Sequence, residues 1–520
     1  MKTAKCSPRR LFETMLAAVC LLSASGCSKS IPSSESLTAY QAVGIDANAG
    51  SWSYIALSGP TQIKVAAPVS TSDPSYAAEL TSVESGQASL SPDQRSAIAY
   101  WSAGGVLRWN EELRQLVARQ DLPPAPNPDG SYPSPSAANP FANPQYPFSN
   151  PPYAARAYSY VSVAQYEALK VAWYYKFLYN RAAPFKNDTK IKALMPDNNV
   201  PSFPSEDAVE AGVNQVMLKL LFPTSAVEID TLAAQQQQAA MLAGRATQSD
   251  LAAGLAIGQA VAAVLSSRAA NDGFKAAGGN AAIWSQLAAA QTAKGEIPWI
   301  SQDGPPRPPM LPLFGSVQSW MLKPADVVAE RPAPPPGTHT AAMAADLQAV
   351  RAAVSNITPD QLATVYKWAD GVSTPTPSGH WDYIAVAYIV AARQSEVRAA
   401  RTFALLNMAL HDAGVGCWDA KYLYFNPRPS QLDPSIRTWT GLPNFPAYVS
   451  GHSDFSAAAS DVLSYLFPDG ASYFAGQAQE AAMSRLYGGI HFPSDISAGF
   501  AHGKRIGDYT VRFAKGDGGN

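Results

Sequence analysis

The stretch Arg401-Thr-Phe-Ala-Leu-Leu-Asn-Met-Ala-Leu-His-Asp-Ala413 decides the fold class of this chain. Its apolar residues recur with the spacing of a helix that buries one face. Asn426-Pro427 must end this helix, because the residue before a proline disfavours helical geometry. We therefore expect the helix to end near Lys421 and Arg428 to lie in the loop that follows.

Helical patterns of the same kind account for most of the remaining chain. Ser91-Pro92-Asp93, for example, is typical of a helix start. The predicted helices cover residues 91–120, 153–179, 206–221, 224–246, 250–268, 340–355, 359–369, 383–408, 452–467 and 475–487, and another begins near Pro493. Strand signals are few and short, as from Trp52 to Leu57. We therefore predict an all-α fold, a helical bundle with its site among the C-terminal helices.

Proline-rich stretches divide this helical chain. Residues 123–152 and 295–336 hold many of the 43 prolines and are predicted to be long irregular connections. The predicted organisation has four parts. These are a signal peptide at 1–26, a tether and irregular N-terminal region at 27–90, a helical region packed on the core at 91–338, and a catalytic core at 339–515.

Three short motifs follow one another near the C-terminus. They are Lys421-x6-Arg428-Pro429, Ser450-Gly451-His452 and Ser484-Arg485-x5-His491-x3-Asp495. A tetrahedral oxyanion is bound by fixed cations and hydrogen-bond donors, and Lys421, Arg428 and Arg485 supply three positive charges. Ser450 and the Gly451 N–H add neutral donors at a predicted helix start, an end that attracts anions. The motifs therefore predict a phosphate-binding site.

Two histidines complete the set. Cleavage of a phosphate ester requires one group that attacks phosphorus and another that gives a proton to the departing oxygen, and His491 and His452 can take these roles. His491 and Asp495 are four residues apart, so their side chains meet if helical geometry extends back from Pro493. The carboxylate would then fix the imidazole tautomer and leave the far nitrogen free to attack.

In order and spacing, the three motifs resemble the superfamily that joins type 2 phosphatidic acid phosphatases, bacterial class A acid phosphatases and vanadium-dependent haloperoxidases. The resemblance implies that five residues bind the anion: Lys421, Arg428, Ser450, Gly451 and Arg485. It also implies that His491 is the nucleophile, His452 the general acid and Asp495 the residue that orients His491. Val449 stands where the family often has proline, which affects loop stiffness and leaves the anion-binding groups in place.

The N-terminal half adds to this resemblance. Segments 151–158, 267–273 and 379–381 look like the soluble bacterial haloperoxidase branch of the superfamily, so the likeness covers most of the mature chain. Only the last 100 residues or so carry specific motifs. The resemblance makes residues 339–515 a phosphatase/haloperoxidase-like core.

Phosphatase and haloperoxidase are both open, because phosphate and vanadate are tetrahedral oxyanions that one pocket can serve. We favour a metal-independent phosphoric monoester hydrolase that works through a phosphohistidine intermediate and needs no cofactor. The short spacing from His452 to Ser484 and the sequence His491-Phe-Pro-Ser-Asp495 resemble the acid phosphatases.

The alternative is a vanadium-dependent haloperoxidase that binds vanadate on His491. Phe445-Pro446-Ala447-Tyr448 and the long N-terminal half resemble that branch. A second alternative is a non-catalytic anion-binding lipoprotein. Pure binding would not require two histidines, so the pair His452 and His491 argues against it.

Other histidines and acids give weaker signals. Pro377-Ser378-Gly379-His380 matches the middle motif but precedes Lys421, so we interpret His380 as structural or as a wall of the site. His411 lies on a mostly apolar helix and is typical of a packed core histidine. Asp412 beside it could be a partner for one of the cations.

The N-terminus indicates the compartment. Lys2, Lys5, Arg9 and Arg10 precede an apolar stretch from Met15 to Leu22, which is typical of an export signal. Ser23-Ala-Ser-Gly-Cys27 resembles a bacterial lipoprotein cleavage site, so we predict a lipid anchor on Cys27. An ordinary secretory signal is the alternative. The predicted location is the bacterial periplasm or cell envelope, tethered to the outer membrane.

Cysteine use agrees with export of the chain. Cys6 and Cys20 leave with the signal and Cys27 carries lipid, so Cys417 alone remains and no internal disulfide is predicted. After the signal, no stretch reaches the roughly 18 uninterrupted apolar residues of a membrane span. The richest candidate, residues 251–265, is too short, so we expect no transmembrane span in the mature chain.

Composition excludes several classes of protein. The chain has 520 residues, of which 47% are hydrophobic and 15% charged, and its formal net charge is −2. These values fit neither a disordered chain nor a nucleic-acid-binding protein. The expected partner is a small phosphorylated substrate, and the affinity for anions must be local.

Overall fold

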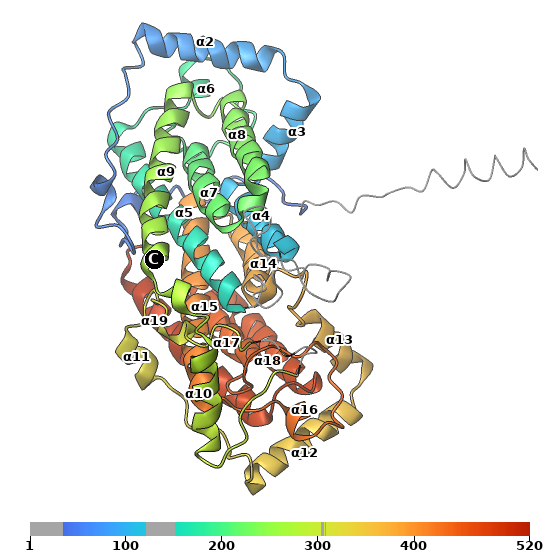
Figure 1. Cartoon of the computed structure of the whole chain (residues 1–520). Coiled ribbons are helices and arrows are strands. Elements are labelled where there is room, and N and C mark those ends of the chain that lie inside the picture. Colours follow the sequence, from blue (N-terminus) through green and yellow to red (C-terminus); the bar gives the residue numbers. More distant parts are fainter. Residues whose placement is uncertain (1–34, 121–150, 303–305, 307) are drawn as a thin grey trace, which may run out of the picture. The chain divides into compact units, whose positions relative to one another are not determined.

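A computed structural model describes residues 35–120, 151–302, 306 and 308–520 of the chain. Within these ranges the fold is all-α, built of α-helices and short 3-10 turns without any strand, as the sequence predicts (Figure 1). The predicted signal peptide, Cys27 and almost all of the stretch 123–152 lie outside the described residues. Residues 38–520 form one compact unit.

The first half of this unit holds nine α-helices in the described ranges. They are α2 (Pro74–Ala88), α3 (Pro92–Trp101), α4 (Gly105–Gln120), α5 (Pro151–Tyr179), α6 (Pro184–Asn187), α7 (Glu206–Leu221), α8 (Ala226–Leu242), α9 (Gln248–Asn271) and α10 (Ala281–Thr292). Ser91 caps α3 through the predicted motif, since its side chain accepts from the N–H of Gln94. The predicted helix 91–120 is divided at Gly104, whose φ of +108° a helix cannot hold.

The second half of the unit contains the three motifs. Its helices are α11 (Pro324–Ala329), α12 (Ala341–Ser355), α13 (Pro359–Lys367), α14 (Thr376–Ala391), α15 (Glu396–Tyr424), α16 (Pro429–Leu432), α17 (Gly451–Leu466), α18 (Ala471–Tyr487) and α19 (Pro493–Gly516). The predicted helix 383–408 is two helices, because Ser395 caps a new one. Every motif lies at a helix end.

Helix α15, which contains the run 401–413, forms the centre of the core. It is buried along nearly its whole length and packs against α5, α17 and α19 (Figure 1). Helices α17 and α19 approach each other closely through glycines. A Cβ on Gly503 would lie 2.0 Å from the Asp454 carbonyl oxygen, and one on Gly499 would lie 2.6 Å from that of Ser450. This close packing brings the second motif against the third.

Helix α9 bears on the expectation that no segment of the mature chain is long and apolar enough to span a membrane. The helical stretch Gln248–Ala276, which contains α9 and the 3-10 turn after it, has 29 residues and includes an 18-residue window with a mean hydropathy of 1.4. By length and composition alone it could cross a membrane. The window 251–265 therefore understated it. Along one face, α9 packs against α7, where Gly254 and Gly258 meet backbone atoms of Ser205 and Val209.

Two short-range predictions in the N-terminal region were wrong. Residues 52–57 form no strand, because the Glu167 carboxylate on α5 accepts from the N–H groups of Ile55, Ala56 and Leu57 at 2.8 to 3.1 Å. These backbone donors thus have a partner that is not a neighbouring strand. Helix α2 lies within the region 27–90, which was expected to be irregular, and Asp73 caps it.

Candidate active site

The first motif places two cations among backbone carbonyls. Lys421 lies in the last turn of α15 and is fully buried. Its Nζ donates to the carbonyl oxygens of Pro446 at 2.8 Å, Ala447 at 3.0 Å and Val449 at 2.5 Å. Lys421 therefore holds the loop that leads into the second motif, and that loop includes the Val449 position.

Arg428 makes the same kind of contact. Its Nη2 donates to the Phe445 carbonyl oxygen at 2.9 Å, and its Nη1 donates to that of Ile490 at 2.8 Å. The same Nη1 lies 3.0 Å from Nε2 of His491. Because only 1% of Arg428 is exposed, burial lowers its pKa to about 10.

Arg485 supplies the third cation from the last turn of α18. Its Nε donates to Ser484 Oγ at 2.9 Å, and its Nη2 donates to the carbonyl oxygens of Trp368 and Val365. Burial lowers the pKa of Arg485 to about 10, and that of Lys421 to about 8. None of the three cations has an ion pair with a described carboxylate.

The second motif opens helix α17. Ser450 is its N-cap, and the Ser450 N–H donates to the Asp495 carbonyl oxygen at 3.0 Å. The Ser450 hydroxyl is fully buried and has no hydrogen-bond partner among the described residues. An orphaned buried hydroxyl at a helix N-terminus is a donor that a bound anion would satisfy.

The third motif brings His491 and Asp495 together, the contact that their spacing predicts. His491 Nδ1 lies 2.9 Å from Asp495 Oδ2, which also accepts the N–H of Phe492 at 3.1 Å. When His491 carries its proton on Nδ1 and donates it to the Asp495 carboxylate, the lone pair of the ring is on Nε2. Burial and the Arg428 charge lower the pKa of His491 well below its usual range, so the ring is neutral.

The carboxyl of Asp495 is itself fully buried. Burial raises the pKa of Asp495 to about 7, against the opposing effect of the Phe492 N–H and of Lys421. Asp495 thus accepts hydrogen bonds from a ring and a backbone donor, and it affects Lys421 and Arg428 electrostatically without forming an ion pair with either.

His452 is the most exposed member of the set. About 14% of its side chain is accessible, against 2% for His491. Burial and then the Arg485 charge lower the pKa of His452 to about 4. Its Nε2 lies 3.5 Å from Oδ2 of Asp370, a residue that the sequence analysis did not identify. The two residues are 82 positions apart, and no local pattern marked Asp370.

His380 from the repeated Ser-Gly-His sequence lies beside this pair. Its Nδ1 is 3.0 Å from Asp370 Oδ1, and its ring stacks on Trp368. His411 is buried against the rings of Phe314 and Trp320, as expected of a core histidine.

Asp412 does not partner a cation of the site, contrary to the possibility raised above. Its carboxylate accepts from the N–H groups of Trp320 at 2.8 Å and Met321 at 2.7 Å. It therefore anchors an irregular segment to α15. A second buried pair was missed by the sequence analysis: Asp454 on α17 and His502 on α19, 2.6 Å apart.

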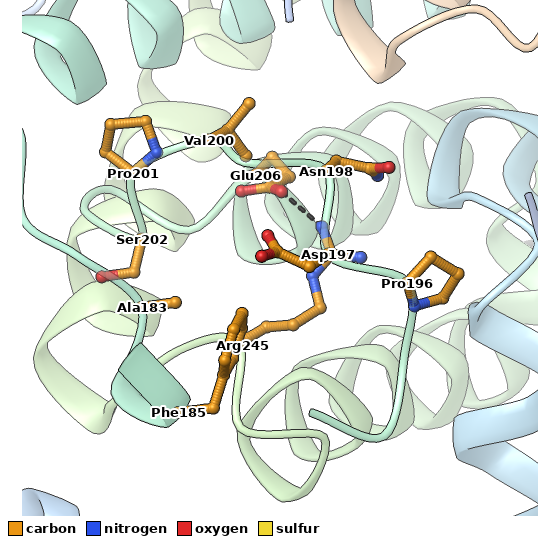
Figure 2. A pocket seen from close by; sticks show the side chains of 10 residues that line it. All are labelled: Ala183, Phe185, Pro196, Asp197, Asn198, Val200, Pro201, Ser202, Glu206 and Arg245. Carbon is orange, nitrogen blue, oxygen red and sulfur yellow. Dashed lines mark hydrogen bonds and ion pairs between the residues drawn. The ribbon is translucent and has the colours of Figure 1, made fainter. Parts of the chain in front are cut away.

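A hollow elsewhere in the chain is distinct from these residues. It is lined by residues between Ala183 and Glu206 together with Arg245, and Figure 2 shows Glu206 and Arg245 paired beside it. None of its lining residues belongs to a motif.

Comparison with known proteins agrees with the fold and the motifs. Residues 400–515 match the profile of the PAP2 superfamily. Among solved structures, the first bacterial vanadium-dependent iodoperoxidase is similar with a TM-score of 0.57 and 19% identity, over 78% of this chain and 95% of that one. Apo- and holo-type bacterial vanadium-dependent chloroperoxidases are similar with TM-scores of 0.51 and 13% identity. They cover 70% and 69% of this chain, and 95% and 91% of their own. A search of curated proteins finds no significant match.

Proposed function

We propose that this chain, whose residues 400–515 belong to the PAP2 superfamily, hydrolyses small phosphoric monoesters through a phosphohistidine at His491. One observation carries the proposal. Three buried cations, Lys421, Arg428 and Arg485, have carbonyl and hydroxyl partners but no ion pair with a described carboxylate. The buried hydroxyl of Ser450, in the second motif, has no hydrogen-bond partner among the described residues.

Buried charges without a counter-ion are costly unless a ligand supplies it. A phosphate group would bring negative charge and up to three acceptor oxygens. Its charge would offset the effect of burial, which lowers the pKa of Lys421 to about 8 and that of Arg428 to about 10. Phosphate oxygens would also take up the Ser450 hydroxyl and the N–H groups at the start of α17.

The two histidines supply the chemistry. His491 attacks phosphorus through Nε2, which carries its lone pair because Nδ1–H is held by Asp495. Arg428 Nη1, which lies 3.0 Å from Nε2, turns its N–H to a phosphoryl oxygen, and this frees the lone pair of Nε2. Cations around the equatorial oxygens stabilise the transition state.

His452 then protonates the departing alkoxide. It lies on the more exposed side of the site while His491 is 2% exposed, so the leaving alcohol departs toward solvent. Neutral His452 next takes a proton from water, which cleaves the P–N bond and returns phosphate and free His491.

A vanadium-dependent haloperoxidase is the second candidate, and its support is the likeness to three haloperoxidase structures. Vanadate fits the same residues, since Ser450 Oγ is an orphaned donor and the cations have no described carboxylate. His491 Nε2 would be its protein ligand, and Lys421, Arg428 and Arg485 would hold its oxygens. When bound, vanadate supplies Lewis-acid activation of peroxide for halide oxidation. His452 would hold or transfer a proton beside it.

Two assays run side by side on one preparation separate the candidates. We expect the purified protein to hydrolyse p-nitrophenyl phosphate without added metal, with inhibition by vanadate. The same protein loaded with vanadate is assayed with hydrogen peroxide and iodide or bromide. Robust halide oxidation without ester hydrolysis would overturn the hydrolase in favour of the haloperoxidase.

We also propose an envelope location with a lipid on Cys27. Mass spectrometry of the protein from a detergent-extracted membrane fraction tests this proposal. A mature N-terminus other than a lipidated Cys27 would contradict the anchor.

A further inference from the structure

The segment from Trp368 to Asp370, between α13 and α14, contacts two residues of the site. The Trp368 carbonyl oxygen accepts from Arg485 Nη2, and Asp370 Oδ2 lies 3.5 Å from His452 Nε2. The segment therefore touches both an anion-binding cation and the acid/base histidine. It belongs to none of the three motifs.

His380 on α14 fixes this segment through two contacts. Its ring stacks on Trp368 with centroids 4.1 Å apart and planes 18° from parallel. Its Nδ1 lies 3.0 Å from Asp370 Oδ1. A carboxylate that accepts on Oδ1 from His380 presents Oδ2 to His452.

The backbone at Asp370 needs such support. Its φ is +44°, in the left-handed region that a residue other than glycine occupies at a cost of about 1 kcal/mol or more unless its surroundings hold it. Trp368 is also fixed on its other side, since its Nε1 donates to Glu480 on α18 at 2.8 Å. Only the Asp370 side chain then needs to be held in position. Among the described side chains, His380 lies closer to its carboxylate, at 3.0 Å, than His452 does, at 3.5 Å.

We propose that His380 is a positioning residue that acts through Asp370 on His452, holding the carboxylate where it stabilises the protonated acid/base histidine. The inference rests on the proposed role of His452 in proton transfer. His380 itself does not touch the reacting atoms.

The charges around this group determine the sign of its effect. His452 is faced by Asp370 from the α13–α14 segment, Arg485 from α18, His380 from α14 and His491 from the turn before α19. His380 is also near Glu480. Arg485 lowers the pKa of His452, Asp370 raises it, and His380 has a smaller lowering effect. Removing the His380 side chain has two opposite effects on the pKa of His452. Misplacement of Asp370 lowers this pKa, and loss of the His380 charge raises it by less, so the net result is a lower pKa.

Two substitutions separate the contacts of His380. His380→Phe keeps a ring to stack on Trp368 and removes the hydrogen bond to Asp370. His380→Asn keeps a donor near the place of Nδ1 and removes the stack. Asp370→Asn removes the carboxylate by a second route, and His339→Phe is the control at an exposed histidine.

Nuclear magnetic resonance of histidine labelled with ¹³C at Cε1 measures the result without turnover. The chain has six histidines, and the spectrum of His452→Gln assigns one of them. His452 is titrated with and without saturating inorganic phosphate. We expect His380→Phe and Asp370→Asn to lower the pKa of His452 by about one unit, and His380→Asn and His339→Phe to change it little.

The rate of ester hydrolysis gives the second readout. We expect the alkaline limb of the kcat/KM profile to move to lower pH in His380→Phe by the same amount, with phosphate affinity within about twofold. An active wild type whose His452 titrates identically in His380→Phe and Asp370→Asn would overturn the inference. A shifted titration in a protein that hydrolyses no ester would support it and reject the hydrolase instead.

Discussion

Buried lysines in the two halves of the molecule have opposite kinds of partner. Lys170 on α5 is fully buried, and its Nζ lies 2.7 Å from Glu167, which is also fully buried. Lys421 on α15 is buried to the same degree and contacts three carbonyl oxygens. Burial alone therefore does not mark a site. Under the proposed function, the cations that form no ion pair with a carboxylate are those that receive negative charge from a ligand.

Arginines repeat this contrast. Arg181 and Arg156 in the first half pair with Asp250 and Asp272. Arg428 and Arg485 in the second half donate to carbonyl oxygens and a serine hydroxyl. Buried Arg401 in the second half is also paired, with Asp517 at 2.8 Å, so the contrast distinguishes the cations of the three motifs from the other buried cations of both halves.

The largest expected effect is the loss of ester hydrolysis without the loss of phosphate binding. His491→Ala removes the group that attacks phosphorus while all three cations remain. We expect hydrolysis of p-nitrophenyl phosphate to fall by about 10³-fold or more, with phosphate binding still measurable by calorimetry. Retained turnover in His491→Ala would exclude a phosphohistidine. A wild type that binds phosphate but hydrolyses no ester would favour a non-catalytic anion-binding protein.

A matched pair of lysine substitutions tests the contrast between the halves directly. Lys170→Met leaves Glu167 buried without its cation, so we expect the free energy of unfolding to fall by about 3 to 5 kcal/mol. Lys421→Met leaves no ion-paired carboxylate without its partner. It removes three hydrogen bonds to carbonyl oxygens but also a buried charge, so we expect the free energy of unfolding to fall by only about 1 kcal/mol. Urea denaturation measures both. Equal losses would remove the distinction.

Inorganic phosphate should stabilise the folded protein through the site in the second half, so that only substitutions there reduce the effect. Phosphate at about 100 times its Kd should stabilise the wild type by about 2.7 kcal/mol, because it binds only the folded site. Thermal melts of Lys170→Met should show a similar gain and those of Lys421→Met a smaller one. A phosphate effect that is lost in Lys170→Met but kept in Lys421→Met would contradict the assignment.

Contacts between residues that are close in the sequence could be predicted from the sequence. The His491–Asp495 contact spans four residues, and Ser450 stands at the N-cap position of the helix that its own motif begins, so local spacing predicted both. Asp370 reaches His452 across 82 positions, and Glu167 reaches residues 55–57 across 110 to 112. Contacts of that kind depend on packing of distant helices, which the local pattern does not contain.

The lowered pKa of His452 gives a smaller, graded effect. Its folded pKa of about 4 lies below the ordinary histidine value, so the acid form is scarce at neutral pH. Ester hydrolysis, as kcat/KM, should decline as pH rises above about 4. Stability should fall as pH drops from about 6.5 toward 4, because the unfolded chain takes up the proton more readily. His452→Gln should remove this part of the stability profile, and an unchanged profile would contradict it.

Calorimetric titration of the purified protein with orthovanadate tests the central claim most directly. Three buried cations without a described carboxylate predict one binding site per chain, weakened by at least tenfold in Arg428→Met and in Arg485→Met and unchanged in Arg181→Lys. Absence of vanadate binding by the folded wild type, or equal binding by the two site variants, would contradict the account.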